Sequence, residues 1–521
     1  MAISQALLSV SDKTGIVDFA KGLHELGINI ISSGGTAKAL KDNGIPCKEV
    51  SDITGFPEIL DGRVKTLQPK IHGGILAIRA KSSHQDDLSK HGITPIDIVA
   101  VNLYPFEQTS TKHPKVASAP VPQEIVEDID IGGVALLRAA AKNLNDVLVI
   151  CENGDYGPVL SALKAGAVTY EMKKNLAAKA FRHTAYYDAL ISAYFTDGQF
   201  PEKMSLGLKK ISPLRYGENP HQPAALYVLG SDTTGTGIVN ARQHHGKELS
   251  YNNYLDMDSA WKLVHEFERP ACAIIKHNNP CGCAEDDTIT SAYLKAYACD
   301  TASAFGGIVA FNRPVEECTA VEITKIFTEC IIAPSFTDEA VKVFSAKKNL
   351  RILTLAGKPS GAPHLNIECR QVSGGMLVQT KDNAVTAEIK TVTKRAPSDD
   401  ELVSMTFAMK VCKHIKSNAI VLAKGTQTIG IGAGQMSRID SLQIAASKMT
   451  LVAKEQIPQN QPLVMASDAF FPFNDVVNES AKAGVKAIIQ PGGSLKDADS
   501  ITAADAHGMA MVMTGMRHFR H

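Results

Sequence analysis

The chain has 521 residues, enough for two to four domains, and its 44% of hydrophobic residues excludes wholesale disorder. Lys and Arg number 54, as do Asp and Glu, so the zero net charge argues against a general nucleic-acid binder that relies on an overall basic field. The ten cysteines are scattered, no apolar run approaches a membrane span in length, and no signal peptide is visible. We therefore expect a cytoplasmic protein with reduced thiols and no membrane partner.

The first third of the chain alternates strand and helix patterns. Buried strands are predicted at Gln5–Val10 and at residues 28–31, 96–103 and 147–150, and a long alanine-rich helix at residues 172–195. Repeated βα units of this kind are typical of an α/β fold with a parallel sheet. Ligands of such sheets bind outside the carboxyl ends of the strands, so we expect a site there.

Two changes in composition predict domain boundaries. Residues 196–210 are polar and contain Gly, Pro and Lys, which predicts a linker between a first domain at residues 1–198 and a second at residues 199–521. The pattern is interrupted again near residues 392–400, before a predicted helix at residues 401–414. The second domain is therefore expected to have two mixed α/β lobes, and no short-period repeat is visible.

A small-residue motif, Ser33-Gly34-Gly35-Thr36, lies between a predicted strand and helix. Small residues let backbone N–H groups approach a phosphate, and a helix N-terminus favours an anion. Ser11 and Lys13 follow the neighbouring strand and would bring a hydroxyl and a cation to the same edge. The alternative is a tight turn with a capping hydroxyl, in which Asp12 caps the next helix.

Two further segments of the first domain carry charges beside glycines. Arg63 and Lys65 occupy alternate positions, so they would face the same side of an extended segment, although a solvated loop is the simpler interpretation. Asp130 precedes two glycines and a predicted helix in which Arg138 and Lys142 lie one turn apart. If Lys142 pointed inward, desolvation would let it exchange protons, whereas an ordinary surface lysine is the favoured alternative.

Lys276 and His277 follow a predicted apolar strand at residues 271–275. A lysine beside a histidine at a strand end suggests a proton-transfer pair, although a lone histidine is more often structural. Cys281 and Cys283 have Cys-x-Cys spacing without an upstream His-x-Glu, so no zinc site is expected.

The last motifs lie in the final fifth of the chain. Residues 430–434 are glycine-rich but do not match Gly-x-Gly-x-x-Gly, which favours a strand or turn close to a ligand, with Arg438 able to bind a phosphate. Residues 467–475 mix aromatic and acidic side chains. Phe470 and its neighbours could hold a flat heterocycle and Asp475 could bond its edge, or the phenylalanines could simply be core.

These segments, in this order, resemble the bacterial type of the bifunctional AICAR transformylase/IMP cyclohydrolase family over essentially the whole chain. Segments that add to the resemblance are residues 9–15, 102–106, 214–222 and 517–521, and Asn278 is one small departure at a position expected to vary. The resemblance implies a methylglyoxal-synthase-like α/β domain followed by two cytidine-deaminase-like lobes that lack zinc. It also implies a homodimer with shared transformylase sites.

The resemblance implies the last two steps of IMP synthesis. A formyl group would pass from 10-formyltetrahydrofolate, as cosubstrate, to AICAR, and the formyl-AICAR would close to IMP with loss of water. No bound cofactor or metal is implied. Three alternatives are compatible with parts of the pattern: a protein with one degenerate half, a nucleotide-binding sensor without turnover, and a zinc deaminase.

Roles in formyl transfer are implied for three residues. His277 would take the proton of the AICAR amine, Lys276 would stabilise or protonate the N10 leaving group of the folate, and Asn418 would hold the formyl oxygen. The substrate-binding residues implied for this activity are Arg215, Tyr216, Asn253, Arg438, Phe470, Asp475, Arg517 and His521.

Roles in ring closure are implied for four residues of the first domain. Asp130 and Lys142 would move protons at the carboxamide, while Tyr104 and nearby backbone would hold the oxyanion. Lys65 would help the water to leave. The residues implied to hold the phosphate and base are Ser11, Lys13, Ser33, Gly34, Gly35, Thr36, Arg63 and Thr66.

Overall fold

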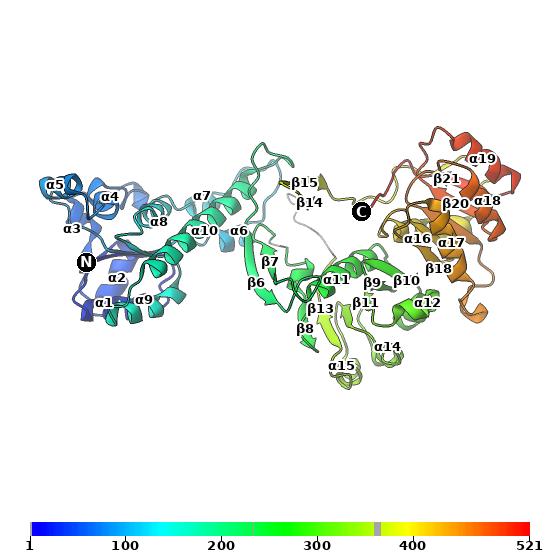
Figure 1. Ribbon diagram of the computed structural model, residues 1–521, viewed down its shortest axis with the longest axis horizontal. Helices are drawn as coiled ribbons and strands as arrows, with labels where there is room; N and C mark the ends of the chain where they lie inside the picture. The colour runs from blue at the N-terminus through cyan, green and yellow to red at the C-terminus, as the bar shows by residue number, and fades with distance from the viewer. Residues whose placement is uncertain (1–2, 233, 359–365) are drawn as a thin grey trace. The chain divides into compact units, whose positions relative to one another are not determined.

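The computed structural model describes residues 3–232, 234–358 and 366–521, which form two compact units. Unit 1 comprises Met1–Lys209 and Leu229–Thr233, and unit 2 comprises Lys210–Val228 and Thr234–His521 (Figure 1). The first division lies at the end of the predicted linker. Within the described ranges, no helix combines the length and hydropathy that crossing a membrane requires.

Unit 1 is built around a five-stranded parallel sheet with helices on both faces (Figure 1). Its strands are β1 (Gln5–Val10), β2 (Asn29–Ser32), β3 (Lys48–Glu49), β4 (Ile98–Asn102) and β5 (Leu148–Ile150). Its helices are α1 (Ile16–Glu25), α2 (Gly34–Asp42), α3 (Val50–Thr54), α4 (Pro69–Leu76), α5 (Ser82–Lys90), α6 (Phe106–Lys112), α7 (Gln123–Glu127), α8 (Gly132–Lys142), α9 (Tyr156–Lys164) and α10 (Tyr170–Phe195). The predicted parallel α/β sheet is confirmed.

The strand order, β3-β2-β1-β4-β5, creates a topological switch point between β1 and β4. The chain leaves β1 toward β2 on one side and later returns with β4 on the other side. The loops that follow β1 and β4 therefore diverge, and a crevice opens at the carboxyl edge of the sheet. Both strands are almost wholly buried, as expected for central strands covered on two faces.

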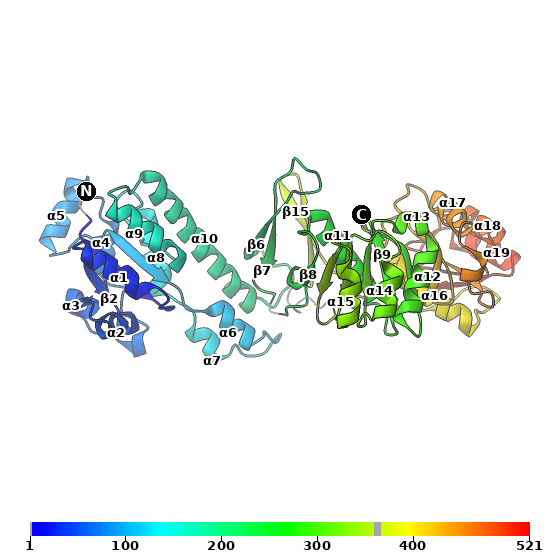
Figure 2. The same cartoon turned by 90° about the horizontal axis from the view of Figure 1, so that it is seen from below.

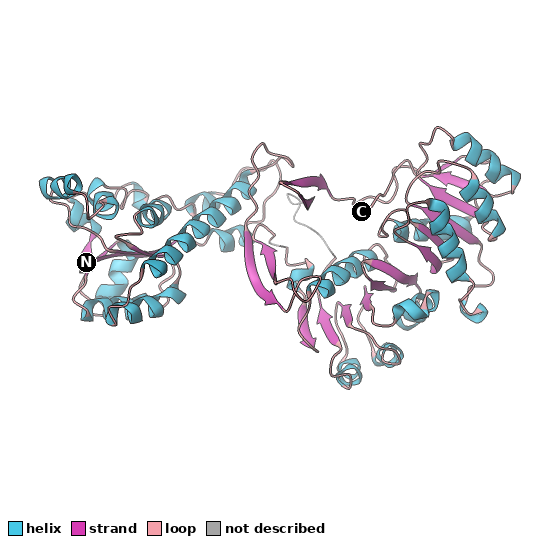
Figure 3. Cartoon of the chain, in the orientation of Figure 1, coloured by secondary structure: helices cyan, strands magenta, loops and turns pink. Residues whose placement is uncertain are grey.

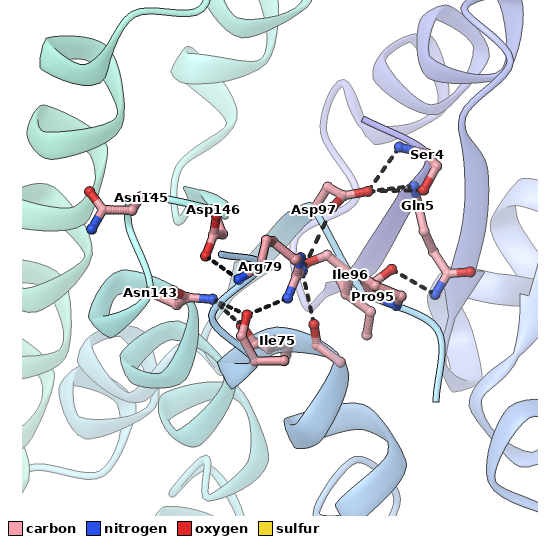
Figure 4. A network of polar contacts seen from close by, with 12 residues as sticks. Ser4, Gln5, Ile75, Arg79, Pro95, Ile96, Asp97, Asn143, Asn145 and Asp146 are labelled. Carbon is pink, nitrogen blue, oxygen red and sulfur yellow. Dashed lines mark hydrogen bonds and ion pairs between the residues drawn. The ribbon is translucent and has the colours of Figure 1, made fainter. Parts of the chain in front are cut away.

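A polar network joins the amino ends of the central strands (Figure 4). Arg79 donates to the backbone oxygen of Ile96 at 2.9 Å and lies 3.7 Å from an oxygen of Asp97. The other Asp97 oxygen accepts the backbone N–H groups of Ser4 and Gln5 at 2.8 and 3.1 Å. Because the Arg79 and Asp97 side chains are only 5% and 12% exposed, this network fixes the edge of the sheet opposite the crevice.

Unit 2 contains a twelve-stranded sheet and smaller hairpins (Figures 2 and 3). The strands of the large sheet are β8 (Arg242–His245), β9 (Ala271–Lys276), β10 (Asn279–Glu285), β11 (Ile308–Phe311), β12 (Cys330–Ala333), β13 (Arg351–Thr354), β16 (Lys390–Thr391), β17 (Ile420–Lys424), β18 (Gln427–Gly432), β19 (Leu463–Ser467), β20 (Ala487–Gln490) and β21 (Ala510–Met513). The hairpins pair β6 (Leu208–Leu214) with β7 (Ala224–Leu229), at the border of the units in sequence, and β14 (Ile367–Val372) with β15 (Gly375–Thr380). The helices are α11 (Tyr251–Val264), α12 (Ile289–Cys299), α13 (Thr301–Ala304), α14 (Glu317–Ile323), α15 (Asp338–Ser345), α16 (Asp399–Cys412), α17 (Arg438–Met449), α18 (Asp475–Lys482) and α19 (Asp497–Ala506).

The large sheet is an internal repeat that the sequence patterns did not reveal. The first repeat runs from β8 through α11 and the β9–β10 hairpin to β13, and the second runs from β16 through α16 and the β17–β18 hairpin to β21. In both, the next strand pairs antiparallel with the hairpin and the last two strands add in parallel. Strands β10 and β18 pair antiparallel and join the repeats into one sheet.

Different helices cover the two faces of this sheet. Helices α11 and α16 lie on one face, where Trp261 and Phe407 belong to a core that both repeats share. The other face has a separate core for each repeat. A Cβ atom on Gly282 of β10 would lie 1.9 Å from the backbone oxygen of Ala296 in α12, so the helix after the first hairpin packs directly on strand backbone.

Candidate active sites

A cavity of about 570 Å³ lies at the carboxyl edge of the unit 1 sheet. Loops after β1, β2 and β4 and the amino end of α8 line it, at the switch point described above. Its volume is in the range of ordinary small-molecule sites. The predicted residues that line it are Ser11, Lys13, Ser33, Gly35, Thr36, Arg63, Lys65, Thr66, Tyr104 and Asp130.

The amino end of α2 gives this cavity an anion-binding corner. Ser33 precedes this nine-residue helix, and Gly34 and Gly35 form its first turn. A Cβ atom on Gly34 would lie 3.9 Å from Lys65 Nζ, and one on Gly35 would lie 4.0 Å from Lys13 Nζ. Two ammonium groups therefore flank a helix N-terminus, which is an arrangement that suits a phosphate.

Backbone contacts fix the loop that carries Lys13. Lys13 Nζ donates to the backbone oxygens of Val10 and Ser11, the second at 3.2 Å. The Thr36 hydroxyl bonds both the N–H and the carbonyl of Val10, each at 3.0 Å. Burial and the nearby charge of Lys65 lower the pKa of Lys13. The cost of holding two like charges together is expected to fall when an anion binds between them.

Asp130 is the acidic group of the cavity. One of its oxygens accepts the N–H of Gly133 at 2.6 Å, at the start of α8. Burial raises the pKa of Asp130 and outweighs the opposite effects of that hydrogen bond, of Lys65 and of the Tyr104 backbone. A carboxyl group with a raised pKa, close to a lysine, is suited to general acid–base catalysis.

Arg63 lies at the open side of the cavity. Its guanidinium forms a two-bond ion pair with Glu127, one bond being 3.3 Å, and both side chains are exposed. Lys65 lies further in and is 3.7 Å from Glu58. Arg63 and Lys65 therefore do not act as one pair. Arg63 lies outside and is paired with Glu127, and Lys65 lies inside, where its charge reaches Asp130.

Lys142 is a surface lysine, as the favoured interpretation of its position predicted. Lys142 is exposed at the last position of α8, whereas the cavity meets the first turn of that helix at Gly133. A rise of 1.5 Å per residue separates the two positions by about 14 Å. The buried face of α8 is made by Leu136, Leu137 and the three alanines 139–141, so Arg138 and Lys142 share the exposed face.

In unit 2, Lys276 and His277 lie at the tight turn between β9 and β10. Lys276 pairs with Asn279 across the strands, so His277 and Asn278 form a two-residue loop. Lys276 is half-buried and donates to the backbone oxygen of Phe305 at 2.7 Å. His277 is exposed, and its φ of 54° is left-handed. The imidazole therefore projects from a strained turn beside a fixed lysine.

The segment before β17 meets this turn across the junction of the repeats. The backbone N–H of Lys416 donates to Asn279 Oδ1 at 3.0 Å. Asn418, two residues further on, donates one amide hydrogen to the Gln435 oxygen at 2.9 Å and keeps a second one available. The predicted trio of Lys276, His277 and Asn418 is thus brought to one region.

A group of predicted cations lies next to Asn418. Arg438 is 3.7 Å from the buried Asp468, and its Nε and Nη2 atoms have no hydrogen-bond partner among the described residues. Two guanidinium groups lie over the Phe519 ring, with Cζ 5.8 Å from the ring centroid in Arg438 and 4.3 Å in Arg517. Buried N–H groups without partners are rare, so the structure provides donors for an anionic or carboxamide group here.

The other predicted residues of unit 2 occupy varied positions. Arg215 and Tyr216 stack at 4.9 Å in a loop that is tied to α11 by the bond from Asn252 to the Glu218 oxygen at 3.2 Å. Asn253 is buried in the capping box of α11 and accepts from the Ser250 N–H at 3.0 Å.

The last three predicted residues lie in loops and at a chain end. Phe470 is half-buried after β19, and Asp475 is the exposed first residue of α18. The backbone oxygen of the exposed His521 accepts from Arg370 of β14.

Several contacts were missed because nothing local in the sequence marks them. Asn102 accepts the backbone N–H groups of Ser11 and Asp12 at 2.5 and 3.0 Å, which shapes the anion-binding corner. Asp256 accepts both N–H groups of the His277 turn. The position of Asn102, at the end of a predicted buried strand, was the only available signal.

Comparisons with known proteins agree with this geometry. A family model described as AICARFT/IMPCHase bienzyme matches residues 140–448, and one described as MGS-like domain matches residues 15–135. The chain belongs to the AICARFT/IMPCHase bienzyme family. It is therefore a bifunctional enzyme of purine biosynthesis that combines AICAR transformylase with IMP cyclohydrolase, as the resemblance predicted, and its first domain is methylglyoxal-synthase-like.

Relatives named "Bifunctional purine biosynthesis protein PurH" match along the full length. The relative from Rhodospirillum rubrum is 53% identical over 532 residues, which is 100% of this chain and 99% of that protein. The relative from Persephonella marina is 52% identical over 526 residues, 99% of each chain. The one from Parvibaculum lavamentivorans is 52% identical over 531 residues, 100% of this chain and 97% of that protein.

Proposed function

We propose that the unit 1 cavity closes formyl-AICAR to IMP. The observation that carries this proposal is that a cation-flanked helix N-terminus and a desolvated carboxyl group face one cavity. The ribotide phosphate binds at the amino end of α2, near Lys13, with Ser11, Ser33, Thr36 and Thr66 around it. The base then reaches toward Asp130 and Tyr104.

Ring closure forms one C–N bond and releases water. The carboxamide nitrogen attacks the formyl carbon, and Asp130 takes the proton that the nitrogen loses. The formyl oxygen takes up a proton and becomes a hydroxyl group held near Tyr104. The nitrogen of the former formamide then loses its hydrogen and forms a C=N bond to the same carbon, and the hydroxyl group, protonated with help from the Lys65 ammonium, leaves as water. Lys65 is suited to this step because it lies close enough to Asp130 for its charge to lower the pKa of that carboxyl group, so both groups can reach the closing ring.

We propose that the junction of the repeats in unit 2 transfers the formyl group. The AICAR amine attacks the formyl carbon of 10-formyltetrahydrofolate, and the bond from that carbon to N10 breaks. His277 takes the amine proton, and Lys276 supplies a proton to N10. Asn418 donates its second amide hydrogen to the formyl oxygen, while Arg438 and Arg517 hold the ribotide.

We propose that Arg215, Tyr216, Asn253, Phe470, Asp475 and His521 complete this site in a homodimer with shared transformylase sites. Exposed apolar side chains on the β14–β15 hairpin support a dimer. Met376 and Leu377 are 50% and 61% exposed, and a two-stranded hairpin is only marginally stable alone. A second copy of the chain would cover these side chains.

Product analysis tests both assignments. Purified enzyme is mixed with AICAR and 10-formyltetrahydrofolate, and nucleotides are separated over time. Wild type is expected to give IMP and tetrahydrofolate, Lys65→Ala to accumulate formyl-AICAR, and His277→Ala to give both products only at a low residual rate. Lys70→Ala, an exposed lysine of α4, is the matched control for Lys65→Ala. IMP formation by Lys65→Ala at the control rate would contradict the ring-closure assignment, and formyl transfer by His277→Ala at the wild-type rate would contradict the unit 2 assignment.

A further inference from the structure

The turn that carries His277 places this residue in a left-handed conformation that side chains other than glycine and asparagine adopt at a cost in free energy. His277 and Asn278 are its two central residues, with φ values of 54° and 61°. Two-residue hairpin loops with positive φ at both positions usually contain Asn-Gly or Gly-Gly, because other side chains clash there. A histidine in this position costs free energy, so some other group must hold the loop.

Asp256 of α11 contacts the backbone of both loop residues. Its Oδ2 accepts the N–H of His277 at 3.2 Å, and its Oδ1 accepts the N–H of Asn278 at 2.7 Å. A carboxylate that accepts two adjacent N–H groups forms charge-assisted bonds that favour one backbone conformation. One turn further along α11, Ser259 donates to Asn278 Oδ1 at 3.0 Å, so the helix also binds the side chain of the second loop residue.

The second repeat provides a comparison within the same molecule. Its hairpin also has a two-residue loop, Gly425-Thr426, and the first position is a glycine with φ 56°. Helix α16 has the same length as α11 and begins with the same kind of capping box. Counted from the capping serines, the position of Asp256 is taken by Ser404, whose buried hydroxyl has no partner among the described residues.

The two hairpins therefore stabilise a left-handed residue at the first loop position in different ways. Where the turn carries no proposed chemistry, glycine removes the strain and no carboxylate is present at the matching helix position. Where the turn carries a histidine, the helix supplies a bidentate acceptor. We infer that Asp256 is a positioning residue for formyl transfer, which holds the left-handed turn and thereby fixes the His277 imidazole beside Lys276.

This inference rests on the proposed role of His277, and the experiment separates the two. Formyl transfer is measured in the full chain for Asp256→Asn, His277→Ala and the double variant. An amide can accept only one of the two N–H bonds and presents its own hydrogens to the other. We expect Asp256→Asn to lower kcat about ten- to hundredfold and to change both KM values less than about threefold.

The double variant gives the decisive comparison. If Asp256 acts only through His277, Asp256→Asn costs nothing further once His277 is alanine. The matched control is Asp258→Asn, on the same helix, whose carboxylate pairs with Lys262 at 2.7 Å. We expect it to keep wild-type kcat. Ring closure of added formyl-AICAR and the urea midpoint of Trp261 fluorescence should be unchanged in Asp256→Asn.

Each failure has a distinct meaning. A wild-type kcat for Asp256→Asn beside a strongly impaired His277→Ala would overturn the inference and leave the proposed function standing. Full activity of His277→Ala would overturn the proposed function and the inference with it. A further loss in the double variant, or a fall in the urea midpoint with equal changes in kcat and KM, would show that Asp256 supports the fold rather than the imidazole, which also overturns the inference.

Discussion

Glu266 links the two repeats of unit 2, and replacing it should show how much that link contributes to stability. Glu266 follows α11, and its Oε1 accepts from Lys413 Nζ and His414 Nε2, both at 2.8 Å, at the end of α16. Burial opposes ionisation of Glu266, but these hydrogen bonds and charges outweigh it and lower its pKa to about 2. Burial also lowers the pKa of His414, so its ring is neutral at pH 7 and Lys413 carries the opposing charge.

The lowered pKa of Glu266 gives both the size of its contribution to stability and the way that this contribution depends on pH. Relative to the ordinary pKa of 4.5, a folded pKa of about 2 corresponds to at most about 3 kcal/mol of stability at pH 7. Because the folded pKa is depressed, this stability is fully present above pH 4.5 and is lost as the pH falls from 4.5 toward 2. Glu266→Gln removes it at neutral pH and leaves the buried Lys413 without its carboxylate. Below pH 4.5 the two proteins should converge.

A single fluorophore makes this measurable in the full chain. Trp261 is the only tryptophan and is buried in α11, so its fluorescence reports the unfolding of unit 2. In urea titrations at about pH 7.5, we expect a free energy of unfolding about 3 kcal/mol lower for Glu266→Gln. The control is Glu268→Gln, an exposed carboxylate two residues away. Equal midpoints for Glu266→Gln and wild type at neutral pH, or a gap at about pH 2.5 as large as the gap at pH 7.5, would refute the argument.

Three further predictions concern ring closure and packing. Asp130→Asn should lower ring closure at least about hundredfold, as measured with formyl-AICAR. It should not lower the unfolding temperature at pH 7.5, because the raised pKa of Asp130 means that ionisation costs stability once the pH rises through that pKa; a lower temperature would contradict this. Arg79→Ala should destabilise unit 1 by about 3–5 kcal/mol, because it leaves Asp97 buried without its cation. Ring closure should then be lost at a lower urea concentration than formyl transfer. Loss of both activities at the same urea concentration would contradict this prediction. Gly282→Ala should lower the free energy of unfolding, followed by Trp261 fluorescence, by about 3 kcal/mol, because its Cβ would lie 1.9 Å from the Ala296 oxygen. An unchanged free energy of unfolding would show that α12 can shift to accommodate the methyl group.

Local patterns predicted the parts of the fold that local physics decides. The central strands of unit 1 are mostly apolar, and the Ser33–Thr36 motif needs only small residues beside a helix start, so both were visible in the sequence. The surface position of Lys142 agrees with its favoured interpretation, but the small residues of α8 did not reveal that this helix meets the cavity by its first turn. Asp256 was invisible for another reason: its partners are backbone N–H groups about twenty residues away, whose positions depend on how α11 lies on the sheet.

The repeat explains why the proposed transformylase groups come from distant parts of the sequence. Antiparallel pairing of β10 with β18 places the start of β17 beside the β9–β10 turn, as the bond from Lys416 to Asn279 shows. One repeat then supplies the reactive turn, and the other supplies donors on Asn418 and Arg438. A single repeat would present either the base or the anion-binding groups, so joining two copies edge to edge is what creates this site. The copies differ at this turn: the first carries His277, the proposed base, and Asp256 accepts its backbone N–H, whereas the second has Gly425 at the matching position.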